Sequence, residues 1–326
     1  MPYKALPTTD LYFLGSMGDL VSGVVRRAQV TRIGDNSFRV GSRYLVVRRD
    51  RDEVVDRILS DQAAEIIYLI DDDLSAADDP SLPEGYRERL AALKAGQYRK
   101  LLDRAALVVA SSDKVAAGLS TKADIRTLHP YWAGTLRTGK HLTAKAGPLD
   151  LVHLGTGSHG AGFDFLKPVI ESLLAGGADI RFHYYGNEPR LGALDDDPRI
   201  VRHGLKSWRR YKAALGRRHF HLGLYPLPDT PFNAGRSINK ILEYTLAGCP
   251  AIYSADWGRA RDLVHGENAF LAEDTVEAWG QAVRDIVAER DRLPAVYEGA
   301  AAHYRRFNDR DAQRLFWLET LVGGNL

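Results

Sequence analysis

The sequence predicts an α/β protein with two domains, each built on a parallel sheet. The chain has 326 residues, which is more than one hydrophobic core usually serves. Short apolar segments rich in branched residues alternate with helical patterns along most of it, as in βαβ units. This alternation stops between residues 131 and 148, where no consistent period is found. We therefore expect a linker there and a cleft between the two domains.

The alternating segments give the expected order of elements. In the first half we expect strands at residues 11–14, 44–47, 66–70 and 107–110, with a helix at 83–103 before the last of them. A second series has strands at 149–154, 180–184, 221–225 and 251–253, with helices at 163–174, 208–215, 237–247 and 276–290. About six such units complete a nucleotide-binding domain. Residues 297–321 are expected to be helical.

Composition excludes several classes of protein. Lys and Arg (44) nearly balance Asp and Glu (42), so nucleic acid is not an expected partner. We expect a cytoplasmic protein, because no segment approaches the ~20 apolar residues of a membrane helix, the N-terminal residues do not resemble a signal peptide, and Cys249 has no disulfide partner. The densest basic segment, residues 206–219, favours a solvated helix face. Contact with anionic lipid at the inner face of the membrane stays open as the alternative.

The expected helix at 237–247 has an apolar and a polar face. Its apolar residues recur at helical spacing and form one buried stripe. On the other side, Arg236, Lys240 and Glu243 are spaced i, i+4 and i+7, so they share a face. Ser237 can cap the start of the helix, and Gly248 can end it.

This polar face suits a nucleotide. The free amides of a helix N-terminus attract phosphate, and Arg236 and Lys240 add full positive charges there. Glu243 can accept two hydrogen bonds from a ribose diol, as acidic residues do in many α/β nucleotide sites. A surface helix with an ordinary Lys–Glu pair is the alternative.

A family resemblance favours the nucleotide. The run Asn-Lys-Ile-Leu-Glu-Tyr-Thr-Leu-Ala-Gly-Cys-Pro-Ala-Ile, residues 239–252, resembles the donor-site helix of GT-B glycosyltransferases related to family 4. Residues 262–271 also resemble that family's turn between a helix and its next strand. The resemblance implies that Glu243 binds the donor ribose and that nearby basic residues bind the diphosphate. Many members carry a second Glu eight residues earlier, which holds the transferred sugar, and that position here is Gly235.

The same resemblance implies the GT-B fold, in which two Rossmann-like domains face one another across a cleft. We expect a short acceptor-side domain at residues 1–145 and a donor-binding domain at 146–305. By analogy with other two-domain transferases, a C-terminal helix at 306–326 packs back on the first domain.

A glycine-rich turn follows the strand at 149–154 and leads into a helix. Glycine lets a backbone approach phosphate closely, and the helix start presents free amides. The turn resembles the first loop of the family, which faces the donor phosphates, so Gly157, Ser158 and His159 are candidate phosphate contacts. A solvent-exposed turn is the competing interpretation.

Three acids, Asp71, Asp72 and Asp73, follow the expected strand at 66–70. The carboxyl ends of strands carry the functional groups of α/β proteins, and similar acids occur in some bacterial transferases of this group, where they would face the acceptor. One carboxylate can then remove the proton of the acceptor hydroxyl. A loop that caps the next helix is the alternative. A divalent-metal site of the GT-A kind ranks lower, because the phosphate-like features lie in the second half of the chain.

The expected function is transfer of a sugar from a nucleoside diphosphate sugar to a hydroxyl of a surface glycan or similar acceptor. The resemblance implies retention of anomeric configuration, and we expect no metal and no cofactor. A nucleotide-sugar epimerase of the GT-B fold is one alternative. The other is a non-catalytic relative that binds glycan or a partner transferase, and the short first domain favours a partner subunit. Arg48, Arg49, Arg51 and His129 are interpreted as structural.

Overall fold

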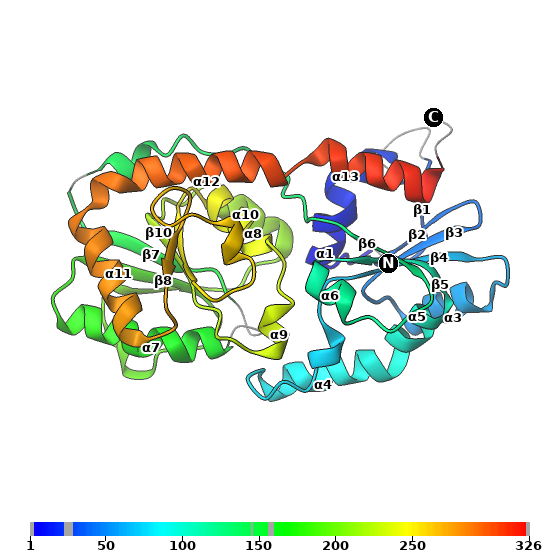
Figure 1. Cartoon of the computed structure of the whole chain (residues 1–326), viewed down its shortest axis with the longest axis horizontal. Coiled ribbons are helices and arrows are strands. Elements are labelled where there is room, and N and C mark those ends of the chain that lie inside the picture. The colour runs from blue at the N-terminus through cyan, green and yellow to red at the C-terminus, as the bar shows by residue number, and fades with distance from the viewer. Residues whose placement is uncertain (1–2, 23–28, 145, 156–159, 324–326) are drawn as a thin grey trace.

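The computed structural model describes residues 3–22, 29–144, 146–155 and 160–323. Two six-stranded sheets lie at the two ends of an elongated molecule, and helices α6 and α9 lie between them (Figure 1). α6 (Asp113–Ala117) belongs to the first half of the chain and α9 (Pro231–Ala234) to the second. The expectation of two α/β domains is confirmed.

The first sheet is mixed, with the order β1-β2-β3-β4-β5-β6. An antiparallel ribbon consists of β1 (Thr31–Arg32), β2 (Ser37–Val40) and β3 (Arg43–Val47). Parallel to β3 run β4 (Glu65–Ile70), β5 (Ala105–Ala110) and β6 (Asp124–Thr127). The parallel strands are connected by α3 (Asp52–Ser60), by α4 (Glu84–Leu93) with α5 (Arg99–Arg104), and by α6. β4 is an apolar run because helices cover this parallel part of the sheet.

The second sheet is wholly parallel, with the order β12-β11-β10-β7-β8-β9. Its strands are β7 (Leu149–His153), β8 (Ile180–Tyr185), β9 (Ile200–His203), β10 (Leu222–Tyr225), β11 (Ala251–Ser254) and β12 (Phe270–Ala272). The helices between them are α7 (Gly160–Ala175), α8 (Trp208–Leu215), α9, α10 (Asn239–Ala247) and, after β12, α11 (Val276–Ala288). This is the strand order of dinucleotide-binding domains. From β7 the chain adds strands toward one edge of the sheet as far as β9, and from β10 it adds them toward the other edge, so the strand order reverses between β7 and β10. Ligands of such sheets bind at that reversal, beyond the carboxyl ends of the strands.

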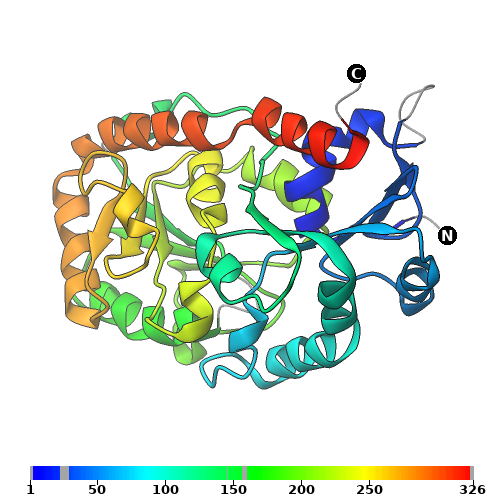
Figure 2. The same ribbon diagram turned by 45° about the vertical axis from the view of Figure 1, so that its right-hand side comes forward.

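Two helices at the end of the chain run along one edge of both domains (Figure 2). α12 (Leu293–Phe307) covers the second domain, and α13 (Arg310–Trp317) contacts α2 (Gly15–Met17) of the first. Trp317 is fully buried and donates from its indole Nε1 to the Tyr12 carbonyl at 2.6 Å. Gln313 accepts from the Ser16 hydroxyl at 2.7 Å. The expected C-terminal helix that crosses back to the first domain is therefore confirmed.

The strand expected at residues 11–14 is wrong. These residues are helical, within a continuous segment made of α1 (Pro7–Thr9), η1 (Asp10–Leu14) and α2. A run of four apolar residues does not distinguish a strand from a buried helix, because both bury it completely. Proline at the first position of α1 favours the helix, and Leu11, Tyr12 and Phe13 are buried.

Several strands have no counterpart in the expected elements, namely β1, β2, β6, β9 and β12. They have two to four residues each, too few for a periodic apolar pattern, and the four residues of β6 are all exposed. Over the described ranges, no helix has both the length and the apolarity needed to cross a bilayer.

Candidate functional site at the domain interface

α10 begins at Asn239 and ends at Gly248, whose φ of +92° is the left-handed conformation that glycine adopts easily. The helix starts two residues later than expected. Ser237 lies in the turn before it and accepts from the Asn239 amide at 3.4 Å. Most of the helix is buried, including Glu243, which is 3% exposed. A carboxylate so deeply buried requires partners.

Glu243 has two such partners. Lys240 Nζ donates to Glu243 Oε2 at 2.5 Å and to the Leu154 carbonyl at 2.6 Å, which ties α10 to the residue that follows β7. The Tyr211 hydroxyl of α8 donates to Glu243 Oε1. Burial, followed by the Glu243 charge, raises the pKa of Tyr211 well above its usual value, so this hydroxyl keeps its proton. Each carboxylate oxygen retains a lone pair for a ligand.

Lys240 and Glu243 lie at the wall of a cavity of about 250 Å³. Its other walls are largely aromatic and come from both domains and the linker: Tyr185, Trp208, Tyr211, Trp132, Pro7 and Leu11. The Trp132 and Trp208 rings lie 5.1 Å apart, and the Tyr185 and Tyr211 rings 5.5 Å apart. An aromatic cavity lined by one carboxylate, Glu243, and two ammonium groups, Lys206 and Lys240, suits a flat ring attached to a polyhydroxylated, anionic group.

Asp10 of η1, next to the lining residue Leu11, connects the first domain to α8. Its carboxylate accepts from the Trp208 indole at 2.8 Å and from Lys212 Nζ. Both partners lie on α8 of the second domain. Helix η1 therefore holds the two domains together beside the cavity.

Arg236 lies in the turn between α9 and α10 rather than on α10 itself. Its guanidinium lies 4.8 Å from the centre of the Phe232 ring, and its Nη1 lies 3.9 Å from Asp72 Oδ1 in the first domain. The structure thus brings Lys240 and Glu243 together, whereas Arg236 faces the acidic segment across the interface.

Asp71 and Asp72 follow β4 and share one basic partner, Arg48. Arg48 donates to Asp72 Oδ2 at 2.5 Å and to Asp71 Oδ1 at 3.3 Å. The Tyr86 hydroxyl also donates to Asp72, at 3.0 Å, and the Thr8 hydroxyl to Asp71, at 2.6 Å. Burial raises the pKa of Asp71, Arg48 partly opposes that rise, and the Asp72 charge adds to it.

Asp73 has a different role. Its carboxylate accepts from the Ser75 amide at 2.9 Å and caps the short helix η3 (Leu74–Ala76). This contact corresponds to the capping alternative for the acidic segment. Among the described residues, no group of three or more His, Cys, Asp or Glu is arranged to hold a metal ion.

Arg48 has an unusual backbone conformation. It is the only non-glycine residue of the described chain with a positive φ, at +59°. Such a conformation persists only where surrounding contacts enforce it. Here the Tyr68 hydroxyl donates to the Arg48 carbonyl at 3.0 Å, while the guanidinium binds the two acids. Burial disfavours the charge of Arg48, but Asp72 and Asp71 outweigh it and hold its pKa well above the usual value.

Gly235 lies directly against the first domain. A Cβ atom there would be 3.0 Å from Asp73 Cβ and 3.5 Å from Val115 Cγ2. The Ser112 hydroxyl also donates to the Gly235 carbonyl at 2.9 Å. A side chain at this position would crowd Asp73, so Asp73 or the contact between the domains would have to shift by a few tenths of an ångström.

Gly157, Ser158 and His159 lie outside the described residues. The residues on either side of them do reach the interface: Leu154 binds Lys240, and a Cβ at Gly160 would be 3.2 Å from Pro83 Cγ in the first domain. The described residue before the turn therefore lies close to α10, and the described residue after it lies close to the first domain.

A second cavity, of about 440 Å³, opens beside the contact between Gly235 and Ser112. The first domain contributes Ser112, Asp113 and Lys114 to its walls, and the second contributes Asp229, Asn233, Asp256, Trp257, Arg259 and Arg261, among others. The Trp257 indole nitrogen is buried without a hydrogen-bond partner among the described residues. None of these residues was a candidate from the sequence, because they come from separate loops that only the fold brings together.

Comparison with known proteins gives matches in structure only. Neither models of protein families nor curated protein sequences match this chain. The structure of Anabaena HepE in complex with UDP and glucose matches with 15% identity and a TM-score of 0.60, over 85% of this chain and 77% of HepE. Sucrose-phosphate synthase of Thermosynechococcus elongatus matches with 14% identity and a TM-score of 0.58, over 81% of this chain and 69% of the synthase. WaaG, a glycosyltransferase involved in lipopolysaccharide biosynthesis, matches with 14% identity and a TM-score of 0.56, over 83% of this chain and 81% of WaaG.

These matches define the class of fold. The chain has the GT-B fold, with two facing Rossmann-like domains and a C-terminal helix that crosses back. Its resemblance to GT-B glycosyltransferases related to family 4 is therefore confirmed at the level of the fold.

Proposed function

We propose that this chain is a glycosyltransferase that moves a sugar from a nucleoside diphosphate sugar to a hydroxyl of a glycan. The observation that carries the proposal is the position of Lys240 and Glu243. They form the polar wall of an aromatic cavity at the strand-order reversal of a GT-B second domain. HepE, which shares the fold, is known in complex with UDP-glucose, so UDP sugars are the first donors to test.

In this proposal the donor spans the interface. The base lies among Tyr185, Trp208 and Tyr211, and the ribose diol donates to the remaining lone pairs of Glu243. The diphosphate contacts Lys240, Arg236 and the turn that contains Gly157, Ser158 and His159. Fixed cations and amides at this place stabilise the charge that develops on the leaving diphosphate.

The transfer itself breaks the bond between the anomeric carbon and the β-phosphate oxygen and forms a bond from that carbon to the acceptor oxygen. We assign the acceptance of the acceptor proton to the Asp71–Asp72 pair. The raised pKa of Asp71 makes it a stronger proton acceptor than an ordinary carboxylate. Asp73 was a third candidate, but its carboxylate already caps η3. Retention of anomeric configuration is proposed from the family resemblance.

The second cavity is the proposed acceptor site. Its charged lining side chains are three acids and three bases, Asp113, Asp229, Asp256, Lys114, Arg259 and Arg261, so it has no charge excess. Balanced charges, an amide and an indole N–H suit the many hydroxyls of a neutral glycan. We further propose that the protein acts in the cytoplasm and that a partner subunit extends the short first domain on the acceptor side.

The test is an assay of nucleoside diphosphate release from UDP, GDP and ADP sugars, with and without oligosaccharide acceptors. The proposal expects release that depends on acceptor. It also expects Asp71→Asn to lower kcat at least about 100-fold while the donor Kd stays within a factor of two or three. Conversion of the donor to an epimer without diphosphate release would instead support the epimerase. Donor binding without turnover in any combination would support the non-catalytic relative.

A further inference from the structure

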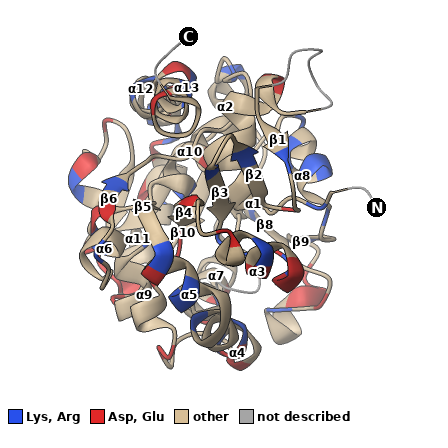
Figure 3. Ribbon diagram, turned by 90° about the vertical axis from the view of Figure 1, so that its right-hand side faces the viewer, with Lys and Arg blue, Asp and Glu red and all other residues tan. Residues whose placement is uncertain are grey.

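Five cations surround the outer side of α8 and have no acidic partner among the residues that the structure describes. Lys206, Arg209, Arg210, Arg217 and Arg218 line one shallow depression together with Ala213 and Ala214. No described Asp or Glu lines it, and the chain has no acidic residue between Asp197 and Asp229. Figure 3 shows α8 with basic and without acidic positions.

Some basic residues on other surface helices do have acidic partners. Arg99 of α5 pairs with Asp103 at 3.0 Å, and Arg314 of α13 pairs with Asp19 at 2.5 Å. Within the described ranges, none of the five cations around α8 has a carboxylate within 4.0 Å. Lys212, on the same helix, does pair with Asp10, but it does so on the side that faces the first domain. The fold thus pairs the inner cation of α8 and leaves the outer ones unpaired.

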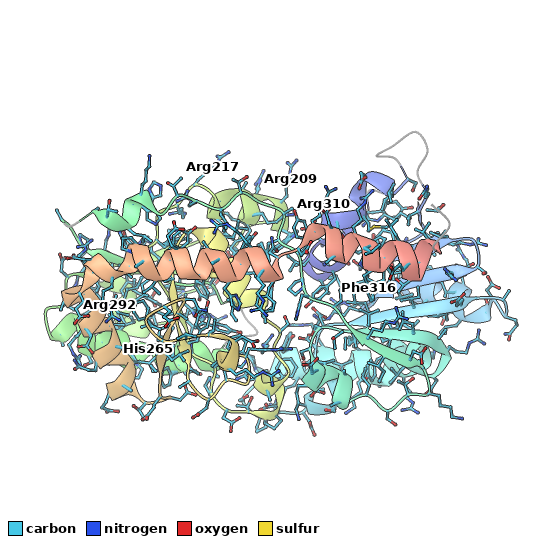
Figure 4. The ribbon with its side chains drawn as sticks, turned by 45° about the horizontal axis from the view of Figure 1, so that its top comes forward. Arg209, Arg217, His265, Arg292, Arg310 and Phe316 are labelled. Atoms are coloured by element: carbon cyan, nitrogen blue, oxygen red, sulfur yellow. The ribbon has the colours of Figure 1, made fainter. Side chains whose placement is uncertain are left out.

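The outer cations are held on a fixed frame. The inner side of α8 is anchored by Trp208, Tyr211 and Leu215, and the turn after it by Arg137, which donates to the Arg218 carbonyl at 2.5 Å. Arg209 and Arg217 both point outward on the same side of the molecule (Figure 4). Leu205, which precedes Lys206 in the chain, is 51% exposed and lines the adjoining aromatic cavity.

We propose that this face, the depression around α8 together with the exposed Leu205 next to Lys206, docks on an anionic lipid surface. Like charges in a fixed array repel one another, so the array gains most from a partner that presents many anions in one plane. Phospholipid headgroups do this, and they also accept an exposed leucine at the interface. A nucleic acid fits less well, because the chain as a whole has a net charge of only +2.

Docking here has a geometric consequence for the aromatic cavity. Lys206 lines both the basic depression and the cavity that contains Lys240 and Glu243. A membrane against the outer side of α8 would therefore lie next to the mouth of that cavity. The docking proposal itself does not depend on the transfer reaction and is tested without it.

The test is co-sedimentation of the full chain with vesicles of pure phosphatidylcholine and with vesicles in which part of it is replaced by phosphatidylglycerol. Each cation near an anionic surface strengthens binding about five-fold. The double variant Arg209→Glu with Arg217→Glu should therefore bind the anionic vesicles at least about 25-fold more weakly. The matched control is Lys94→Glu with Lys167→Glu. It makes the same change in net charge at exposed positions of η4 (Lys94–Tyr98) and α7.

Support requires that the wild type and the control bind the anionic but not the neutral vesicles, and that the α8 variant loses this binding. The proposal is overturned if the wild type does not bind anionic vesicles at low salt, or if the control loses as much binding as the α8 variant. It is also overturned if inorganic phosphate abolishes binding when sodium chloride at equal ionic strength does not. That result would mean a pocket for a single anion rather than a surface for a bilayer.

Discussion

Removal of the Glu243 charge should destabilise the second domain, and removal of its partner charge should restore part of the loss. In Glu243→Gln, the Lys240 ammonium group keeps the Leu154 carbonyl but loses its carboxylate, and it is only 12% exposed. A hydrogen bond to a charged group contributes roughly 1.5 to 3 kcal/mol, and breaking a fully buried pair costs more. We expect a loss of about 2 kcal/mol, since the Gln amide oxygen still accepts a hydrogen bond.

The assay is a double-mutant cycle with Lys240→Met, Glu243→Gln and the combination, measured by urea denaturation and calorimetry. A loss of 2 kcal/mol corresponds to a fall in Tm of about 4 to 8 °C for a domain of this size. The combined variant leaves no unpaired buried charge, so the coupling energy should be at least about 1 kcal/mol. The exposed pair Arg99–Asp103 is the control, and its coupling should stay below about 0.5 kcal/mol. Equal coupling in the two cycles would refute the view that Lys240 and Glu243 form a buried unit.

Three further predictions concern single residues. Arg48→Ala should be about 1 kcal/mol less stable than Arg48→Gly by chemical denaturation, because glycine adopts the φ of +59° without the steric cost of a Cβ atom. The reverse order would contradict that backbone conformation. Burial lowers the pKa of His153 to about 4, so the unfolded chain binds more protons between about pH 6.5 and pH 4, and stability should be lost as pH falls through that range. His153→Gln should reduce this slope in urea titrations. Gly223→Ala should lower the free energy of unfolding by at least about 1 to 3 kcal/mol, because its Cβ would lie 2.3 Å from the Tyr244 ring. Gly204→Ala is the control: this position has open space around it, so the loss should be less than about 0.5 kcal/mol.

Much of the second domain can be predicted from the sequence because its signals are local. The periodic apolar residues of α10, the spacing of Lys240 and Glu243, and the glycine at the helix end all lie within one segment. Their joint burial at the domain interface is not local. It depends on Tyr211 and Leu154, which are far away in the chain and reach the helix only in the folded sheet.

The first domain is harder to predict because its site is built from tertiary contacts. The apolar run at residues 11–14 gives no indication that it is helical and that Asp10 reaches α8 of the second domain. Likewise Arg48 looks like any basic residue after a strand, since its positive φ and its contacts with Asp71 and Asp72 exist only in the fold. The aromatic walls of the cavity had one local signal, the two aromatic residues Trp208 and Tyr211 spaced i, i+3 on the same helix.

The most direct test of the proposed donor site is a crystal structure with UDP bound. The ribose hydroxyls should lie within about 3 Å of the Glu243 carboxylate, with the diphosphate near Lys240 and Arg236 and the base among the rings of α8. A nucleotide bound elsewhere, with the aromatic cavity empty and the Glu243 carboxylate in contact only with Tyr211 and Lys240, would contradict the assignment.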